Sequence, residues 1–264
     1  MHKYILILIL LISTKALSFE ELMFKPLTAN IIEPRIGAFY QFQPDKLRLD
    51  IGSSVDLTGY RQNAMTELRC GADFYTFTRL RSEDNFKFPV ETSDYYFGVN
   101  VVIKHLIECI PTYLRIRFAH ISSHMVDGLA KDSVFNPKPF VYSREFLDVI
   151  WAMHFDSVRL YAGGSWVYSR KPSNGNAFVP QLGLDFSYPL STKYSIVGGY
   201  DFKLLGFDGK YLGASAAQAG VLWNASVNAG IMWSVYFYNG ASFHGMFFKE
   251  RDSYIGTGFQ VVFY

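Results

Sequence analysis

The chain has 264 residues, of which half are hydrophobic, 17% are aromatic and only 18% are charged, against about 25% in an ordinary soluble domain. This composition excludes a disordered chain, and two cysteines exclude a disulfide scaffold. A formal net charge of +2 gives no electrostatic basis for binding nucleic acid. A helical membrane protein would need runs of about 18 apolar residues. The longest such run, residues 4–12, is too short.

The N-terminus has the form of a secretory signal peptide over residues 1–18. A short basic start precedes the apolar run, and Ala16 and Ser18 supply the small residues of a cleavage site. We therefore expect export to an oxidising compartment, where the spacing leaves open whether Cys70 and Cys109 pair. Residues 19–33 are expected to form a periplasmic N-terminal segment, and residues 34–264 an outer-membrane β-barrel.

Apolar residues alternate with polar ones along nearly the whole mature chain, which predicts strands rather than helices. About 20 residues per strand and connection is typical of an up-and-down transmembrane barrel, whereas strands of soluble sandwiches average about 5–6 residues. The sequence predicts an all-β fold, a transmembrane up-and-down antiparallel β-barrel of about 12 strands. We expect these strands near residues 34–44, 46–58, 64–79, 92–106, 110–122, 143–155, 157–169, 177–188, 193–204, 212–223, 226–238 and 252–264.

The predicted connections alternate in length. They are short after the even-numbered strands and longer after strands 3, 5, 7, 9 and 11, as outer-membrane barrels show, with the longest at residues 123–142 and 239–251. This pattern places both termini on the short-turn, periplasmic side. The aromatic C-terminal strand resembles the recognition signal of bacterial outer-membrane proteins, although Tyr264 is out of phase by one residue. That resemblance implies the barrel-assembly machinery as a partner.

Polar residues of both signs occupy the parity opposite to the apolar coat. Because the interior of a barrel of this size is narrow, they are expected to form a salt-bridged, largely filled lumen. These residues are Arg48, Asp50, Asp73, Lys104, Arg115, Arg117, Asp148, Arg159, Asp185, Asp201 and Lys203.

One place departs from the alternation. In the strand at residues 110–122, the lipid-facing parity continues into His120 and Ser122, and the same parity of the next strand carries Ser143 and Glu145. Polar groups that face lipid are costly unless they lie near the interface. Here they suit catalysis, with Ser122 as the nucleophile, His120 as its base and Glu145 orienting the imidazole. The location points to acyl esters of outer-membrane lipids as the substrate.

The same three residues carry a local resemblance. Outer-membrane phospholipase A and lipid A 3-O-deacylase have a His-x-Ser pair on the lipid-facing side of a barrel strand, with an amide or acid on the neighbouring strand. His120, Ser122 and Glu145 match these roles in spacing and side.

A broader resemblance covers most of the chain, which is similar to the domain-of-unknown-function 1207 family. That resemblance implies an outer-membrane barrel of Gram-negative bacteria and carries no assigned activity. Where the family pattern continues the His-x-Ser-Ser-His stretch with Leu-Gly-Asp, this chain has Met125-Val126-Asp127. The segments that carry the resemblance are residues 24–30, 33–35, 120–124, 142–145 and 181–183.

Simpler interpretations of these residues stay open. His120 and Ser122 would equally serve as rim residues that bond headgroups or water. Ser123, His124 and Asp127 lie in a long loop, where polar residues are expected. His124 with Asp127 would offer calcium only two ligands, which is too few, so we predict no cofactor.

Two further residues have equally plain interpretations. Arg144 with Glu145 has the form of an ordinary rim ion pair, and His244 in the last long loop is expected to be solvated.

Two non-enzymatic functions remain as alternatives to lipid hydrolysis. One is a narrow pore or transport protein that uses luminal residues such as Arg115 and Arg117. The other is a structural or adhesive barrel that acts through its long extracellular loops. The sequence leaves open the lipid, the oligomeric state and the organism.

Overall fold

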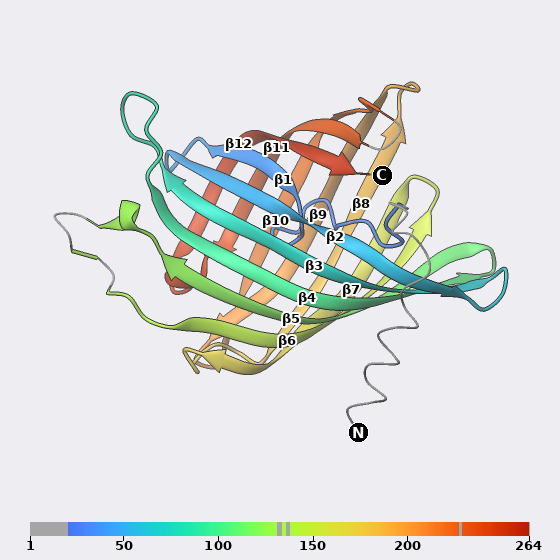
Figure 1. Ribbon diagram of the computed structural model, residues 1–264, viewed down its shortest axis with the longest axis horizontal. Coiled ribbons are helices and arrows are strands. Elements are labelled where there is room, and N and C mark those ends of the chain that lie inside the picture. Colours follow the sequence, from blue (N-terminus) through green and yellow to red (C-terminus); the bar gives the residue numbers. More distant parts are fainter. Residues whose placement is uncertain (1–20, 131–133, 136–137, 227–228, 264) are drawn as a thin grey trace, which may run out of the picture.

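A computed structural model describes residues 21–130, 134–135, 138–226 and 229–263, so the expected signal peptide and Tyr264 lie outside the described residues. Twelve antiparallel strands form one closed barrel in which β1 pairs with β12 (Figure 1). This confirms the predicted fold. The strands are β1 (Ile36–Gln41), β2 (Lys46–Arg61), β3 (Thr66–Arg81), β4 (Val90–Ile107), β5 (Ile110–Met125), β6 (Tyr142–Phe155), β7 (Val158–Lys171), β8 (Phe178–Pro189), β9 (Tyr194–Phe207), β10 (Lys210–Trp223), β11 (Ala229–Ala241) and β12 (Arg251–Phe263).

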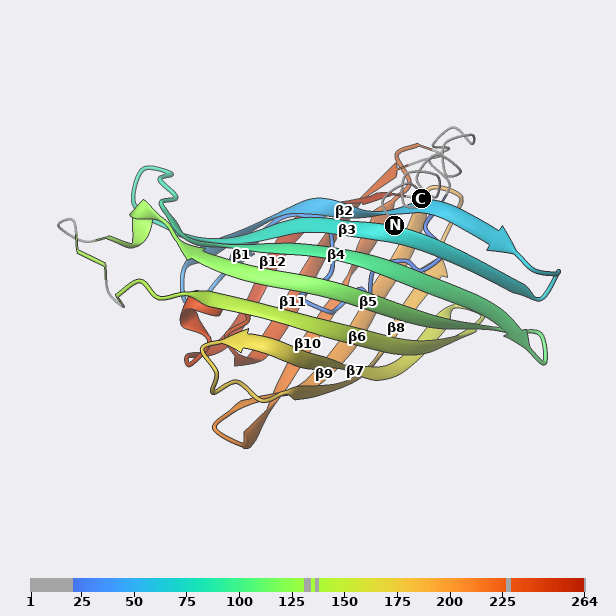
Figure 2. The ribbon, with the colours of Figure 1, turned by 60° about the horizontal axis from the view of Figure 1, so that its bottom comes forward.

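The connections separate into two ends, as the strand pattern predicts. The β5–β6 connection, which includes the short helix η1 (Asp127–Leu129), projects at the left in both views (Figures 1 and 2). One prediction was wrong: the connection after β9 is a tight turn, not a long loop. The ladder continues to Phe207 and Lys210, and positive φ angles of 53° at Asp208 and 74° at Gly209 suit a two-residue hairpin turn.

The apolar residues of the alternating pattern form an apolar coat on the outer wall of the barrel. Phe118, Trp151 and Phe259 are 56%, 47% and 59% exposed on the outer wall, whereas their neighbours Arg117 and Ile150 are buried inside. Closure of the sheet pairs the backbone groups that an open edge would leave unsatisfied in lipid. Within the described residues, no helix has the length and hydropathy needed to cross a membrane.

The lumen is filled by charged side chains that pair with one another, as predicted. Of the expected inward residues, all are buried except Lys104, which is half-buried. The luminal ion pairs include Arg48–Asp50, Arg79–Glu91, Arg117–Asp73, Arg159–Asp185 and Lys203–Asp201. Because each charge has an opposite partner, this interior is a packed polar core.

The residues that precede β1 run inside the barrel. We expected residues 19–33 to form a periplasmic segment; in the structure Glu21 is exposed, and the chain enters the lumen between the buried residues Phe24 and Glu33. Arg159 of β7 donates hydrogen bonds to the carbonyl oxygens of Lys25 (2.7 Å) and Pro26 (2.9 Å). Leu27 is fully buried. Backbone groups that a disordered tail would expose to water are instead bonded to the barrel wall.

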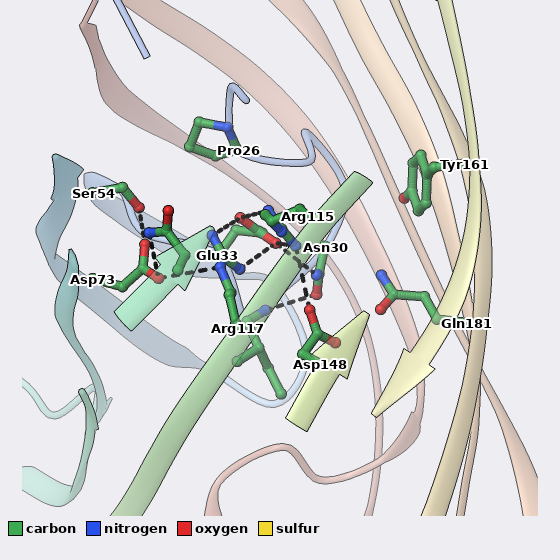
Figure 3. Close-up of polar contacts among 12 residues, drawn as sticks. Pro26, Asn30, Glu33, Ser54, Asp73, Arg115, Arg117, Asp148, Tyr161 and Gln181 are labelled. Carbon is green, nitrogen blue, oxygen red and sulfur yellow. Dashed lines mark hydrogen bonds and ion pairs between the residues drawn. The ribbon is translucent and has the colours of Figure 1, made fainter. Parts of the chain in front are cut away.

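Glu33 fixes this segment at the centre of the lumen. Its carboxylate lies between two arginines of β5, 2.7 Å from Arg115 Nη2 and 3.0 Å from Arg117 Nη1 (Figure 3). Asp148 and Asp73 flank the two arginines at 3.6 Å and 3.2 Å. Burial alone would raise the pKa of Glu33, but the two guanidiniums outweigh it and lower the pKa to about 2.

The last loop, residues 242–250, joins β11 to β12 and folds inward over the long-loop end of the lumen. It contains the short helix η2 (Gly245–Phe247). The prediction that His244 is solvated was wrong, since it is 1% exposed. His244 Nδ1 lies 2.8 Å from Asp94 Oδ2, and the Gly245 amide donates to Asp94 Oδ1 at 2.8 Å. This loop and the N-terminal segment therefore fill the lumen from opposite ends.

The two cysteines lie in different parts of the barrel and differ in solvent exposure. Cys70 lies half-buried in β3 and Cys109 is exposed in the β4–β5 turn, and both are free. The disulfide that the sequence left open is not formed.

Candidate functional site on the outer wall

The register of β5 and β6 brings the predicted site residues together. His120 lies directly opposite Glu145, and Ser122 lies directly opposite Ser143. Directly opposed residues on one face of an antiparallel pair have Cβ atoms only about 4.5–5.5 Å apart. Four polar side chains therefore share a small area of the outer wall near the long-loop end.

Glu145 is the centre of the hydrogen bonding in this cluster. Its Oε1 lies 3.0 Å from His120 Nδ1 and accepts the Ser143 hydroxyl at 2.8 Å. The His120 side chain is 39% exposed and that of Glu145 is 30% exposed. Because His120 bonds the carboxylate through Nδ1, its Nε2 is the nitrogen that remains to receive a proton from a nucleophile.

Ser122 lies on the same face as His120, two residues further along β5, and is half-buried. A spacing of two residues along a strand separates the Cα atoms by about 6.5–7 Å. In the described structure no hydrogen bond joins Ser122 Oγ to His120. Bonds of this kind are often long in ligand-free enzymes and tighten when a substrate is bound.

Ser169 of β7 is a member of the cluster that the sequence did not reveal. It pairs with Glu145 across the ladder and donates a side-chain hydrogen bond to that carboxylate. A β-bulge lies here, because Phe146 pairs with Val167 and leaves Tyr168 as an extra residue. The bulge reverses the parity of β7 and turns Ser169 outward. Strict alternation from Val167 would have placed it in the lumen.

The remaining candidates from the sequence have other surroundings. Ser123 faces inward, and its Oγ accepts the Met246 amide at 3.1 Å. The exposed His124 ring packs against the Tyr95 ring in a T-shaped arrangement, with centroids 5.6 Å apart.

Asp127 and Arg144 also lie apart from the cluster. Asp127 is exposed at the start of η1. Arg144 lies over the Tyr142 ring at 5.0 Å and forms no ion pair with Glu145 in the described structure. No group of three or more metal-ligating side chains occurs among the residues described.

The wall behind the cluster is closely packed on its inner side. The inward residues Ala119, Ile121 and Phe146 belong to an apolar core that also includes Met246 and Phe247 of the last loop. Side chains packed this closely lose the freedom to shift. The last loop therefore supports the strands that hold His120, Ser122 and Glu145 on the other face.

Solved structures of similar fold are outer-membrane barrels. The phospholipase A of the Escherichia coli outer membrane matches with a TM-score of 0.59 and 11% identity, over 88% of this chain and 92% of that one. The Salmonella typhi outer membrane phospholipase, a dimer with bound calcium, matches with a TM-score of 0.60 and 10% identity, over 93% and 95%. At such identities the similarity concerns the fold alone.

Comparison by sequence gives one family match and no match to a curated protein. No curated protein matches the chain. A family profile described as "Protein of unknown function (DUF1207)" matches residues 99–263, which include β5, β6 and β7 and so the whole outer-wall cluster. The opening residues 24–35 lie outside the matched region. The chain is an outer-membrane-type β-barrel that belongs to the DUF1207 family.

Proposed function

We propose that this protein is a lipid acyl-ester hydrolase whose catalytic residues are Ser122, His120 and Glu145. The observation that carries the proposal is the hydrogen bond between His120 Nδ1 and Glu145 Oε1 on a lipid-facing wall, with Ser122 on the same face. A histidine oriented by a carboxylate beside a serine is the arrangement that activates a hydroxyl nucleophile.

The chemistry follows from the free imidazole nitrogen. His120 Nε2 takes the proton of the Ser122 hydroxyl as Oγ attacks the carbonyl carbon of the ester, and Glu145 stabilises the imidazolium that forms. His120 then gives that proton to the leaving alcohol, which departs and leaves an acyl group on Ser122. Water, deprotonated by His120, attacks this second ester and releases the fatty acid.

The surroundings favour a lipid as the ester. Phe97, Phe118 and Trp166 pair with or neighbour the cluster and are 47%, 56% and 55% exposed. Side chains of this kind suit contact with acyl chains. A soluble ester would reach this wall only through the membrane, whereas a membrane lipid already lies beside it. The E. coli and S. typhi barrels of similar fold are named as phospholipases, which agrees with this substrate class.

The proposal includes a cellular location. The chain is exported by its signal peptide, is inserted by the barrel-assembly machinery into the outer membrane of a Gram-negative bacterium and has periplasmic termini. With the long loops outside, the cluster lies at the extracellular rim. Outer-membrane lipids are its partners, and Ser122 chemistry needs no cofactor.

The direct test is hydrolysis of membrane lipid by the purified, folded barrel. The wild type should release fatty acid from mixed micelles, and Ser122→Ala should abolish release. Ser123→Ala is the matched control, because Ser123 is the next residue but faces the lumen. Both variants should keep the heat-modified gel mobility of a folded barrel. Equal lipid products from Ser122→Ala and the wild type would remove the proposal and leave the pore and adhesive alternatives.

A further inference from the structure

An open cavity of about 1150 Å³ lies at the short-turn end of the lumen. Its lining includes Asp156 and Thr192, from the turns that follow β6 and β8, and the N-terminal residues 21–23 and 25–28. Sites for small molecules are cavities of about 300–1,000 Å³ that combine apolar walls with a few polar groups. This cavity, here called the short-turn cavity, is therefore large enough to hold a small organic molecule.

Lys104 of β4 brings an uncompensated positive charge to the wall of the short-turn cavity. The carboxylate directly opposite it in the ladder is that of Glu67, which pairs instead with Arg61 and Arg69, each at 3.0 Å. Lys104 Nζ lies 5.9 Å from the centre of the Tyr113 ring, and Lys104 forms no ion pair within the described part of the chain. A half-buried ammonium group without a counter-ion favours the binding of an anion.

His154 of β6 adds a hydrogen-bonding group to the same part of the wall. Its ring centroid lies 4.8 Å from that of Tyr113, the ring over which Lys104 also lies. Among the described residues, none accepts or donates a hydrogen bond at the His154 imidazole. A neutral imidazole keeps one N–H, which can donate to an anion. An ammonium group and an imidazole N–H are therefore both available beside one tyrosine ring.

The carboxylates that line the cavity do not neutralise Lys104. Glu21, Glu67 and Asp185 form ion pairs with other cations, and Asp156 is exposed in the turn after β6. An anion from outside the chain would provide the missing opposite charge.

The wall across the barrel carries apolar side chains. Val197 of β9, Leu222 of β10 and Met232 of β11 line the cavity there. In the closed ring of twelve strands, these strands lie across the lumen from β4, β5 and β6. A molecule that fills the cavity therefore meets positive charge on one side and hydrocarbon on the other.

We propose that the short-turn cavity binds a small organic acid, whose carboxylate is held by Lys104 and His154 and whose hydrocarbon part lies toward the apolar wall. Hydrogen bonds between an ammonium group and a carboxylate are charge-assisted and stronger than those between neutral groups. This inference is independent of the proposed function, because the outer-wall cluster lies on the other face of the barrel, near its long-loop end.

The test is calorimetric titration of the folded, full-length barrel in lipid nanodiscs. Hexanoate is the probe, and it should bind at least tenfold more tightly than hexanol, which lacks the charge, or acetate, which lacks most of the hydrocarbon. Lys104→Gln and His154→Phe should each weaken hexanoate binding about tenfold, whereas Lys104→Arg should retain it. Lys193→Gln is the control, since Lys193 is exposed in a turn at the same end but does not line the cavity.

Each part of the proposal has an outcome that would overturn it. Variants are compared only after heat-modified gel mobility shows that they are folded. Absent binding of hexanoate to the wild type, equal binding by Lys104→Gln, or an equal loss in Lys193→Gln would overturn the site. Hexanol that binds as tightly as hexanoate would overturn the assignment to an anion. Acetate that binds as tightly would overturn the part of the apolar wall.

Discussion

His120 Nδ1 and Glu145 Oε1 lie 3.0 Å apart across the β5–β6 ladder, on the face of the barrel that carries its apolar coat. Elsewhere on this coat the exposed positions are mainly large apolar side chains. Placing a hydrogen-bonded histidine and carboxylate against lipid costs free energy. Their presence on this face therefore indicates that they serve a function.

The first prediction concerns the role of Glu145. Glu145→Gln should lower the kcat for lipid hydrolysis about tenfold, because an amide oxygen still accepts the His120 Nδ1 hydrogen but no longer stabilises the imidazolium. Glu145→Ala should lower it about a hundredfold or more, with KM little changed. Hydrolysis by the folded variants is measured on one lipid. Equal activity of the wild type and Glu145→Ala would show that Glu145 has no part in catalysis.

The second prediction concerns the luminal charge at Glu33. Glu33→Gln should lower the free energy of unfolding by about 3–5 kcal/mol, because it leaves Arg115 and Arg117 buried with less compensation. Urea-induced unfolding in lipid vesicles gives the value. Glu83→Gln is the control, since Glu83 forms an exposed ion pair with Arg81. A loss no greater than that of the control would contradict the central role of Glu33.

Acid provides a third prediction from the same residue. The pKa of Glu33 is lowered from 4.5 to about 2 in the folded barrel, so its contribution to stability is fully present above about pH 4.5. That contribution, about 3 kcal/mol, is lost as the pH falls from 4.5 through 2. The stability difference between the wild type and Glu33→Gln should therefore shrink over this range. A difference that stays constant down to pH 2 would contradict the assignment.

The fourth prediction concerns the inward fold of the last loop. Asp94→Asn should weaken the bonds to His244 and the Gly245 amide and so expose residues 242–250 to protease. Limited proteolysis of the folded barrel, followed by mass spectrometry, locates the cut. Asp84→Asn in the β3–β4 loop is the control, because Asp84 is exposed. Equal resistance of the wild type and Asp94→Asn would show that Asp94 does not hold the loop.

The strands could be predicted from the sequence because lipid and lumen impose opposite chemistry on alternate residues. The same rule placed His120, Ser122, Ser143 and Glu145 on one face, where the structure also has them. It missed Ser169 because a bulge at Tyr168 shifts the parity by one, and an extra residue leaves no mark in a period-two pattern.

Segments without a period were beyond this kind of prediction. Residues 24–35 and the last loop fold into the lumen through specific long-range contacts, such as Glu33 with Arg115 and His244 with Asp94. Charges and apolar residues in a loop suit solvent as well as a polar lumen, so composition alone could not distinguish the two. Their burial depends on which partners the closed barrel presents.

The most direct measurement of the central claim is covalent labelling of Ser122, the proposed catalytic serine. The folded barrel is treated with a long-chain alkyl fluorophosphonate, which reacts with serines activated by a base, and the modified peptide is identified by mass spectrometry. We predict one adduct, on Ser122, that is absent in His120→Ala and still forms in Ser123→Ala. An unlabelled wild type, or an adduct that persists in His120→Ala, would contradict the assignment of His120 as the base of an activated Ser122.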